Sequence, residues 1–123
     1  MEINEITQTV IGCAMRVHSR LGPGLLERAY HRCLVHELAK LDMVVESQVA
    51  LPINYDGLKI DAAYRVDLRV EGVVLVEVKA VDTVLPVHHA QLLSYLQLSG
   101  IHLGLLLNFN VVHMRDGIKR LIR

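Results

Sequence analysis

The hydrophobic pattern of this chain is most informative in the run Val73-Val74-Leu75-Val76-Glu77-Val78-Lys79-Ala80-Val81. One alternate set of positions is entirely apolar, and only Glu77 and Lys79 interrupt the other. A strand that is apolar on both faces is typical of a sheet covered on both sides. Ionised groups are costly there unless they are paired or bind a metal. Glu77 and Lys79 are therefore the first candidate functional residues.

The segment before this run alternates cleanly, with Arg65 and Asp67 on one face of a second strand. A turn centred on Gly72 sets Asp67 opposite Glu77, and a divalent cation such as Mg²⁺ would relieve the repulsion between the two carboxylates. A turn centred on Glu71 instead sets Arg65 opposite Glu77 as an ordinary cross-strand ion pair. The pattern leaves both registers open, because the turn geometry decides between them.

Helical and strand patterns divide the rest of the chain. Apolar residues recur at helical spacing from Asn4, the expected N-cap, to Gly22, and a second apolar stripe opens at Pro23 and runs to Leu41. Strands are predicted at residues 43–55, 58–70, 73–81, 101–109 and 111–114, a third helix at residues 87–98, and a short final segment at residues 118–122. The order ααβββαββ predicts an α/β (α+β) fold in which helices flank a mixed central sheet.

Length and composition add expectations about organisation. The 123 residues fit a single domain over residues 1–123. Hydrophobic residues make up 52% of the chain against 21% charged residues, which is more apolar than average soluble usage. Part of this surplus fits a homodimer interface, although a sheet covered on both faces would also use it.

Charge restricts the argument for nucleic-acid binding to local patches. Thirteen basic and thirteen acidic residues cancel, which removes the usual argument from net charge. Solvated helix faces explain the local candidates for phosphate contacts equally well. Those candidates are Arg16, Arg20, Arg28, Arg32, Lys119, Arg120 and Arg123.

Cysteine spacing and the first residues indicate a location. Cys13 and Cys33 show no CxxC spacing, so we expect free thiols in a reducing compartment. The residues after Met1 lack a signal-peptide pattern, and no apolar run approaches the roughly 20 residues of a spanning helix. We therefore expect a cytoplasmic protein that does not insert into a membrane.

Several short motifs together resemble a known family. The segment Gly24-Leu25-Leu26-Glu27-Arg28-Ala29-Tyr30 matches the pattern GxxExxY that names a group of small proteins. This group looks like a compact branch of the PD-(D/E)XK nuclease superfamily, and the likeness extends over nearly the whole chain. It implies a restriction-endonuclease-like core. The other matching segments are residues 65–68, 76–80, 87–95, 108–109 and 116–120.

The resemblance also implies a catalytic site. Asp67 and Glu77 would hold Mg²⁺ together with the backbone carbonyl of Val78, and Mn²⁺ could substitute. Lys79 would be the positively charged member of the signature. The helical acid Glu27 would join the metal site.

Further residues are implied around that centre. Gln91 and Tyr95 match a QxxxY helix, in which such residues orient the lysine and contact the nucleic-acid backbone. Tyr30 would support the site from the GxxExxY segment. Additional nucleic-acid contacts are expected from Arg28, Arg65 and His88.

Each of these residues also has a structural alternative. Glu27 could form an ion pair with Arg16, Arg20 or Lys79. Tyr30 and Tyr95 lie on apolar stripes, where a core tyrosine with a satisfied hydroxyl is common. Gln91 could be a surface amide, and His88 could belong to a helix cap. The seven histidines show no spacing suited to a zinc site.

The residues allow three functional hypotheses. The first is a magnesium-dependent nuclease that hydrolyses DNA phosphodiester bonds, with RNA as a further possible substrate. In it, Lys79 could orient the attacking water, stabilise the developing charge, or act as a base. The second is a nuclease-fold module that binds nucleic acid or a protein partner without useful turnover. The third is a structural protein whose acids form internal ion pairs.

Overall fold

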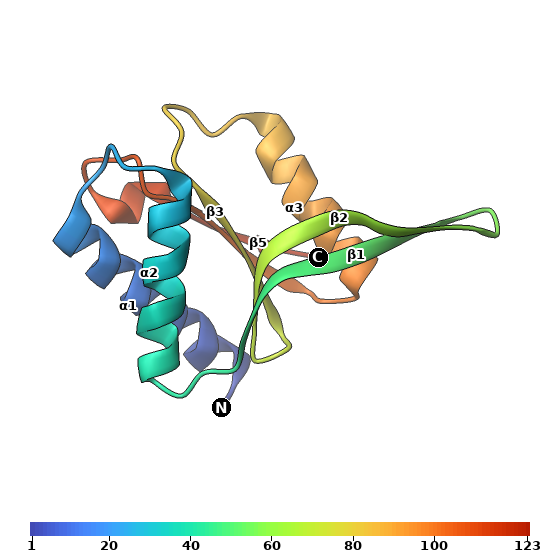
Figure 1. Cartoon of the computed structure of the whole chain (residues 1–123), viewed down its shortest axis with the longest axis horizontal. Helices are drawn as coiled ribbons and strands as arrows, with labels where there is room; N and C mark the ends of the chain where they lie inside the picture. The colour runs from blue at the N-terminus through green and yellow to red at the C-terminus, as the bar shows by residue number, and fades with distance from the viewer.

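Five strands form one mixed sheet in the order β1-β2-β3-β4-β5 (Figure 1). The structure is a computed structural model that describes residues 1–123, with Ala62 described by its backbone alone. The elements are α1 (Ile3–Leu21), α2 (Glu27–Lys40), β1 (Val45–Tyr55), β2 (Leu58–Val70), β3 (Val74–Lys79), α3 (Pro86–Ser99), β4 (Leu103–Asn108), the 3₁₀ helix η1 (Met114–Gly117) and β5 (Ile118–Ile122).

The sheet combines a meander with one crossover. β1, β2 and β3 pair antiparallel in chain order. Helix α3 then carries the chain from β3 to β4, which runs parallel to β3, and β5 returns antiparallel to β4. The predicted mixed sheet flanked by helices is confirmed.

Strand β3 separates two hydrophobic cores, as its two apolar faces predicted. Val74, Val76 and Val78 pack in one core with side chains of α1 and α2. Leu75 packs in the other core with side chains of α3. Glu77 belongs to the same alternate set as Leu75 and is only 5% exposed. The strand therefore carries a carboxylate into the interior of the protein.

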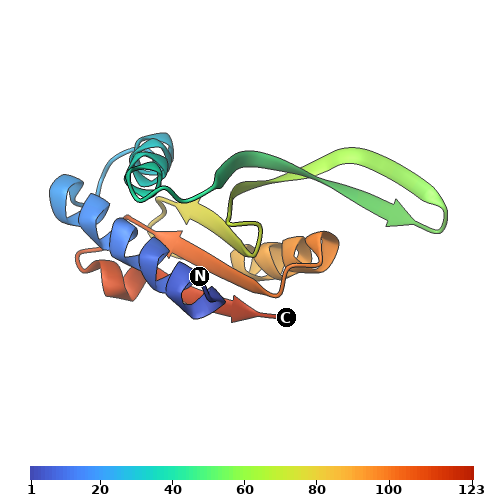
Figure 2. The ribbon, with the colours of Figure 1, turned by 90° about the horizontal axis from the view of Figure 1, so that it is seen from below.

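The β1–β2 hairpin extends well beyond the rest of the sheet (Figures 1 and 2). Its register shifts between Leu51 and Ile53, on either side of Pro52. Because directly paired residues point to the same side of a sheet, the pairs Tyr55–Leu58 and Ile53–Ile60 form an apolar stripe on one face of the hairpin. Tyr64 continues this stripe toward the body of the protein.

Two predicted helix starts are wrong. Helix α1 begins after Glu2, whose backbone N–H donates to Glu5 Oε1 at 3.2 Å, so Asn4 is not the N-cap. Helix α2 begins at Glu27 and not at Pro23, because the intervening loop is held in a different conformation by Tyr30, as described below. None of the helices in the described chain is both long and apolar enough to cross a membrane.

The strand predicted at residues 111–114 is also wrong. These residues form bends that lead into η1, and the last strand is β5. His18 Nε2 lies 2.7 Å from the carbonyl oxygen of Val111, which binds this segment to α1. Gly117 lies so close to Asn108 that an added Cβ would be 2.0 Å from the Asn108 carbonyl oxygen. These contacts hold the segment between β4 and β5 close to α1 and to the end of β4, so it does not pair as a strand.

Candidate active site

The β2–β3 register sets Asp67 opposite Glu77. The cross-strand pairs Leu68–Val76 and Val70–Val74 centre the turn on Gly72. The alternative register, with Arg65 opposite Glu77, is therefore wrong. The next pair along the same register is Asp67 and Glu77, so the two carboxylates lie on one face of neighbouring strands.

A contact with the start of β1 holds this turn. Glu71 has a left-handed backbone conformation, with φ of 52°. Its N–H donates to the Val44 carbonyl oxygen at 2.8 Å, and its Oε2 accepts from the Val44 N–H at 2.8 Å. Gly72 follows with φ of 70°, which a glycine adopts without steric cost. The turn, and with it the register, depends on a residue outside the hairpin.

The β2–β3 ladder ends just before the two acids, and their side chains replace its next hydrogen bonds. Glu77 Oε1 accepts from the Asp67 N–H at 2.9 Å, and Asp67 Oδ2 accepts from the Val78 N–H at 2.8 Å. Hydrogen bonds from N–H groups to carboxylates are stronger than neutral ones. Each acid is thus oriented by the backbone of the opposite strand.

Lys79 lies on the same side of β3 as Glu77. Its Nζ is 3.8 Å from Glu77 Oε2, and the lysine side chain is 17% exposed. The two oxygens of Glu77 therefore face different partners, the Asp67 backbone and the lysine. This places an ammonium group beside the carboxylates at the edge of the interior.

Burial and the negative charge of Asp67 raise the pKa of Glu77 to about 7. The Asp67 N–H and the Lys79 ammonium act in the opposite direction, and Glu27 adds a smaller increase. The increase prevails because a nearly dry environment disfavours the charged carboxylate. A strongly raised pKa of this kind, caused by burial and a like charge, is typical of functional sites.

The GxxExxY segment carries Glu27 to these acids. Gly24 has φ of 96°, a conformation that favours glycine, and its N–H donates to Asn110 Oδ1 at 3.1 Å. Tyr30 is fully buried and stacks on Phe109 at a centroid distance of 4.7 Å. Its hydroxyl donates to the Gly22 carbonyl at 2.6 Å and accepts from the Leu25 N–H at 3.0 Å. The tyrosine thus fixes the loop from which α2 begins at Glu27.

The charge of a strand acid affects the pKa of Glu27. Burial and the Asp67 carboxylate raise the pKa of Glu27, whereas Lys79 and His31 act to lower it. Glu27 and Asp67 line the same hollow. The ion pairs among the described side chains join Arg16 and Lys40 to Glu37 and not to Glu27. Glu27 therefore faces the strand acids and not the arginines of α1.

Helix α3 contributes from the other side of the sheet. Tyr95 is 5% exposed, and burial together with the charges of Glu77 and Asp67 raises its pKa. Its ring lies 6.0 Å from that of Tyr64 on β2. Gln91 is half-buried one turn earlier and lines a hollow of about 560 Å³ with both tyrosines. The tyrosine is close to the acids, and the glutamine lies on the same side of α3.

Gln48 lies beside the candidate site, and sequence reasoning missed it. It lies between the pairs Ser47–Leu68 and Val49–Val66, across from Asp67. Its φ of 54° is unusual for a residue within a strand. Gln48 lines the hollow that contains Asp67. Backbone strain of this kind is common at functional sites. The pattern of polar and apolar residues in β1 does not predict it.

The predicted nucleic-acid contacts differ in position. Arg28 is exposed and lines the hollow beside Asp67. Arg65 is exposed on β2, where it pairs with Ala50. His88 is half-buried, and its Nδ1 accepts from the Leu85 N–H at 3.0 Å, so it caps α3. Arg28 is therefore the one of these three that shares a hollow with a strand acid.

The carboxylate oxygens of Asp67 and Glu77 suit a hard divalent cation. No group of three or more His, Cys, Asp or Glu side chains is close enough to hold a metal within the described residues. Mg²⁺, however, keeps several waters and needs only one or two carboxylates. The facing acids Asp67 and Glu77 provide these, and a cation between them would offset the burial and the like charge that raise the pKa of Glu77. The residues therefore fit the cation.

Comparison with known proteins agrees with this geometry. No curated protein and no solved structure matches the chain significantly. A family model described as PD-(D/E)XK nuclease superfamily matches residues 4–121. The mixed sheet flanked by helices is consistent with a restriction-endonuclease-like fold. Since the match covers nearly the whole chain, the protein belongs to the PD-(D/E)XK nuclease superfamily.

Proposed function

We propose that this protein is a magnesium-dependent nuclease of the GxxExxY type that hydrolyses phosphodiester bonds in DNA. The observation that carries the proposal is the pair of facing acids, half-buried Asp67 and buried Glu77, with Lys79 beside them. Superfamily membership supports hydrolysis of nucleic acid as the reaction class. Mn²⁺ is expected to substitute for Mg²⁺, because it accepts the same oxygen ligands.

In this proposal, Asp67, Glu77 and the Val78 carbonyl hold the cation, and Glu27 approaches it from α2. A divalent cation at this position supplies a Lewis acid for the phosphoryl group and activates water. Hydrogen bonds from opposite strands already orient both acids, and each keeps its second oxygen outside these bonds. Preorganised charge of this kind is the main source of rate enhancement in such sites.

Lys79 and the α3 residues act on the substrate in this proposal. The lysine ammonium orients the attacking water and stabilises charge on the phosphoryl oxygens. Its side chain is mostly buried but retains 17% exposure, which gives it access to a bound strand. Tyr95 and Gln91 support this end of the site from α3, on the side of the hollow that also contains Tyr64.

Cleavage assays test the proposal. Labelled single-stranded DNA, duplex DNA and RNA are incubated with the purified protein in Mg²⁺, Mn²⁺ or chelator. We expect cleavage of DNA that needs a divalent cation and falls at least about 100-fold in Asp67→Asn and Lys79→Met. Asp61→Asn, which changes an exposed acid on the same strand, is the matched control. Cleavage that survives both site substitutions would contradict the assignment.

A specific observation also favours a second function, binding without turnover. Both strand acids already accept hydrogen bonds from the backbone, so each has a partner in the fold even without a cation. A module that has lost catalysis could keep this arrangement. Metal-independent binding of nucleic acid, with no cleavage of any of the three substrates, would favour this alternative.

The exposed stripe on the β1–β2 hairpin supports a proposal of homodimerisation. Tyr55, Leu58, Ile60 and Tyr64 are 71%, 58%, 43% and 46% exposed on the projecting hairpin. Exposed apolar groups that are contiguous mark interaction surfaces. A second copy of the chain is the proposed occupant, because it would present the same self-complementary stripe about a two-fold axis.

A further inference from the structure

Three adjoining hollows follow α2 away from the candidate site. The first, about 580 Å³, contains Asp67 and Glu27. The second, about 380 Å³, shares His31 and Arg32 with the first. The third, about 360 Å³, shares Arg32 and His36 with the second. Because neighbouring hollows share residues, they lie next to one another along α2, and we call the three together the α2 groove.

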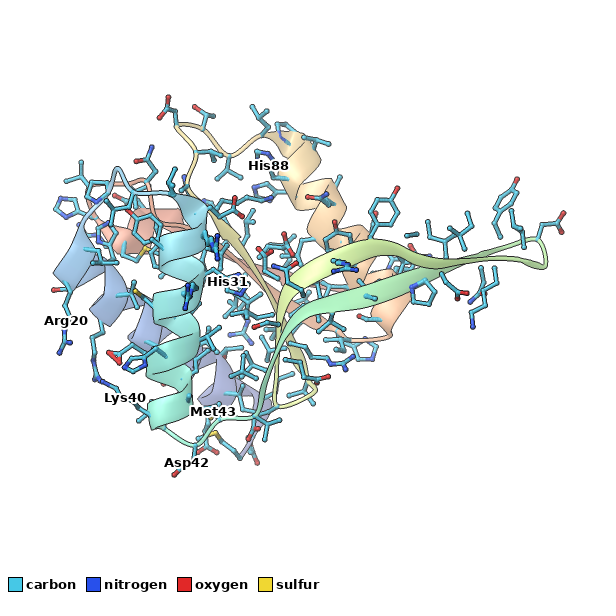
Figure 3. All side chains as sticks on the ribbon, viewed as in Figure 1. Arg20, His31, Lys40, Asp42, Met43 and His88 are labelled. Carbon is cyan, nitrogen blue, oxygen red and sulfur yellow. The ribbon has the colours of Figure 1, made fainter. Side chains whose placement is uncertain are left out.

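Basic side chains dominate this groove. Figure 3 shows His31 on the side of α2 that faces β1 and β2, Lys40 toward the far end of α2, and Arg20 beside α1 on the opposite side of α2. Arg28 and Arg32 are exposed between these ends. The groove lining includes Arg20, Arg28, His31, Arg32, His36 and Lys40.

The arginines of the groove lack acidic partners among the described side chains. The ion pairs of that part of the chain involve Arg16, Lys40, Lys59, Arg69 and Lys79. The acid at the far end, Glu37, is already matched by Lys40 at 2.7 Å. Glu27 and Asp67 lie only at the catalytic end. The middle of the groove is therefore positive, although the whole chain has zero net charge.

The length of the positive region suits a polynucleotide strand. Eight residues separate Arg28 from His36, which is about 12 Å along a helix that rises about 1.5 Å per residue. Each strand of a DNA duplex carries one phosphate for about 3.4 Å of helix axis. Measured along that axis, the positive region is therefore as long as about three phosphate steps of one strand.

We propose that the α2 groove binds the sugar-phosphate backbone of the substrate strand on its way to Asp67. Arg28 and Arg32 contact the phosphates nearest the site, and Arg20 extends the path at the far end. This inference rests on the proposed function for its direction, since the acids at one end are taken as the place of cleavage. The contacts are to phosphates, so binding is independent of base sequence.

Fluorescence anisotropy in chelator tests the groove without any cleavage. The probes are labelled oligothymidine, oligouridine and a DNA duplex, each of about 20 nucleotides or base pairs, which exceeds a typical site size. We expect Arg28→Gln/Arg32→Gln to weaken binding roughly 20-fold at 0.1 M salt, because two phosphate contacts contribute about 1.4 to the salt slope on a single strand. The slope of log affinity against log salt should fall by that amount.

Two matched variants keep the test specific. Arg28→Lys/Arg32→Lys retains the charge and should keep most of the affinity. Lys59→Gln/Arg115→Gln removes two exposed charges outside the groove and should bind like the wild type. Thermal unfolding shows whether each variant is folded. Equal loss in both glutamine pairs would overturn the groove, and so would a wild type that binds none of the probes.

The outcomes separate this inference from the proposed nuclease activity. If Asp67→Asn binds as the wild type does and no protein ever cleaves DNA, the nuclease proposal fails and the groove stands. If the wild type cleaves DNA and Arg28→Gln/Arg32→Gln binds and cleaves equally well, the groove fails and the nuclease stands. The three probes also identify which kind of strand the groove prefers.

Discussion

At the scale of single residues, Glu77 is the group most affected by its surroundings. It is only 5% exposed and lies beside Asp67, yet it is also 3.8 Å from the Lys79 ammonium. Burial and the like charge prevail and raise its pKa to about 7. Without a cation, this carboxylate therefore destabilises the folded protein at neutral pH.

The first prediction concerns pH and Glu77→Gln. The folded-state pKa of about 7 exceeds the ordinary 4.5, so the contribution of Glu77 to stability is fully present below about pH 4.5 and is lost as the pH rises through 7. In chelator, Glu77→Gln should therefore raise the free energy of unfolding by about 1 to 3 kcal/mol at pH 8 and change it little at pH 4. Urea unfolding at several pH values measures this.

Glu46→Gln is the control of opposite sign. Its hydrogen bond and ion pair with Arg69 lower the pKa of Glu46, so its stabilising effect is present above the ordinary pKa and is lost as the pH falls. Because Glu46 is 45% exposed, water screens this pair and the effect should be smaller than that of Glu77→Gln. If Glu77→Gln is no more stable than the wild type at pH 8, burial of the charged form is not the dominant effect.

At the scale of elements, the GxxExxY segment works as a loop anchor followed by a helix start. Glu27 is the first residue of α2, and Tyr30 lies one turn later in the core. The two hydrogen bonds of the Tyr30 hydroxyl hold the loop at Gly22 and Leu25. The motif thus joins a residue that faces the acids to a residue that determines where the loop runs.

The second prediction concerns Tyr30→Phe. This change keeps the stacking on Phe109 but leaves the Gly22 carbonyl and the Leu25 N–H without their partner. We expect the free energy of unfolding to fall by about 1 to 3 kcal/mol. We also expect cleavage to fall at a temperature where the variant remains fully folded, because Glu27 is no longer held.

Tyr55→Phe provides the comparison, since Tyr55 is 71% exposed on the hairpin. It should change stability by less than about 0.5 kcal/mol. Unfolding curves and cleavage rates of the three proteins separate the two effects. Unchanged stability in Tyr30→Phe would show that the loop does not depend on the hydroxyl.

At the scale of the whole molecule, the projecting β1–β2 hairpin is the feature least explained by the core. Its tip extends far from both hydrophobic clusters (Figure 2). The apolar stripe on this hairpin nevertheless stays exposed in the single chain. A surface of this kind is stable in water when a partner covers it.

The third prediction is therefore a dimer that depends on the hairpin. Leu58→Ser/Ile60→Ser should convert a dimer into a monomer, because it removes apolar area from the centre of the stripe. Light scattering after size-exclusion chromatography measures the mass. Val73→Ser/Val112→Ser, two exposed apolar residues on other segments, should leave the dimer intact. A wild type that is monomeric at high concentration would contradict the proposal.

Much of the fold was predictable because the signals are local. The two apolar faces of residues 73–81 predicted a strand between two cores, and the side chains of β3 do pack in both cores. Helical spacing, followed by Gly100, predicted α3 within one residue at each end. The strand predicted at residues 111–114 was wrong, because the buried apolar residues of this segment pack beside α1 and do not belong to the sheet.

The sequence by itself determined which residues are buried, in which kind of element, and that two acids and a lysine would need an explanation. Periodicity encodes these properties, since it depends on neighbours a few positions apart. Only the tertiary structure decided the register, through the contact of Glu71 with Val44. It alone brought Glu27 and Gln48 to Asp67 and aligned the arginines of the α2 groove. Contacts between distant segments depend on how elements pack, and a local pattern carries no record of that packing.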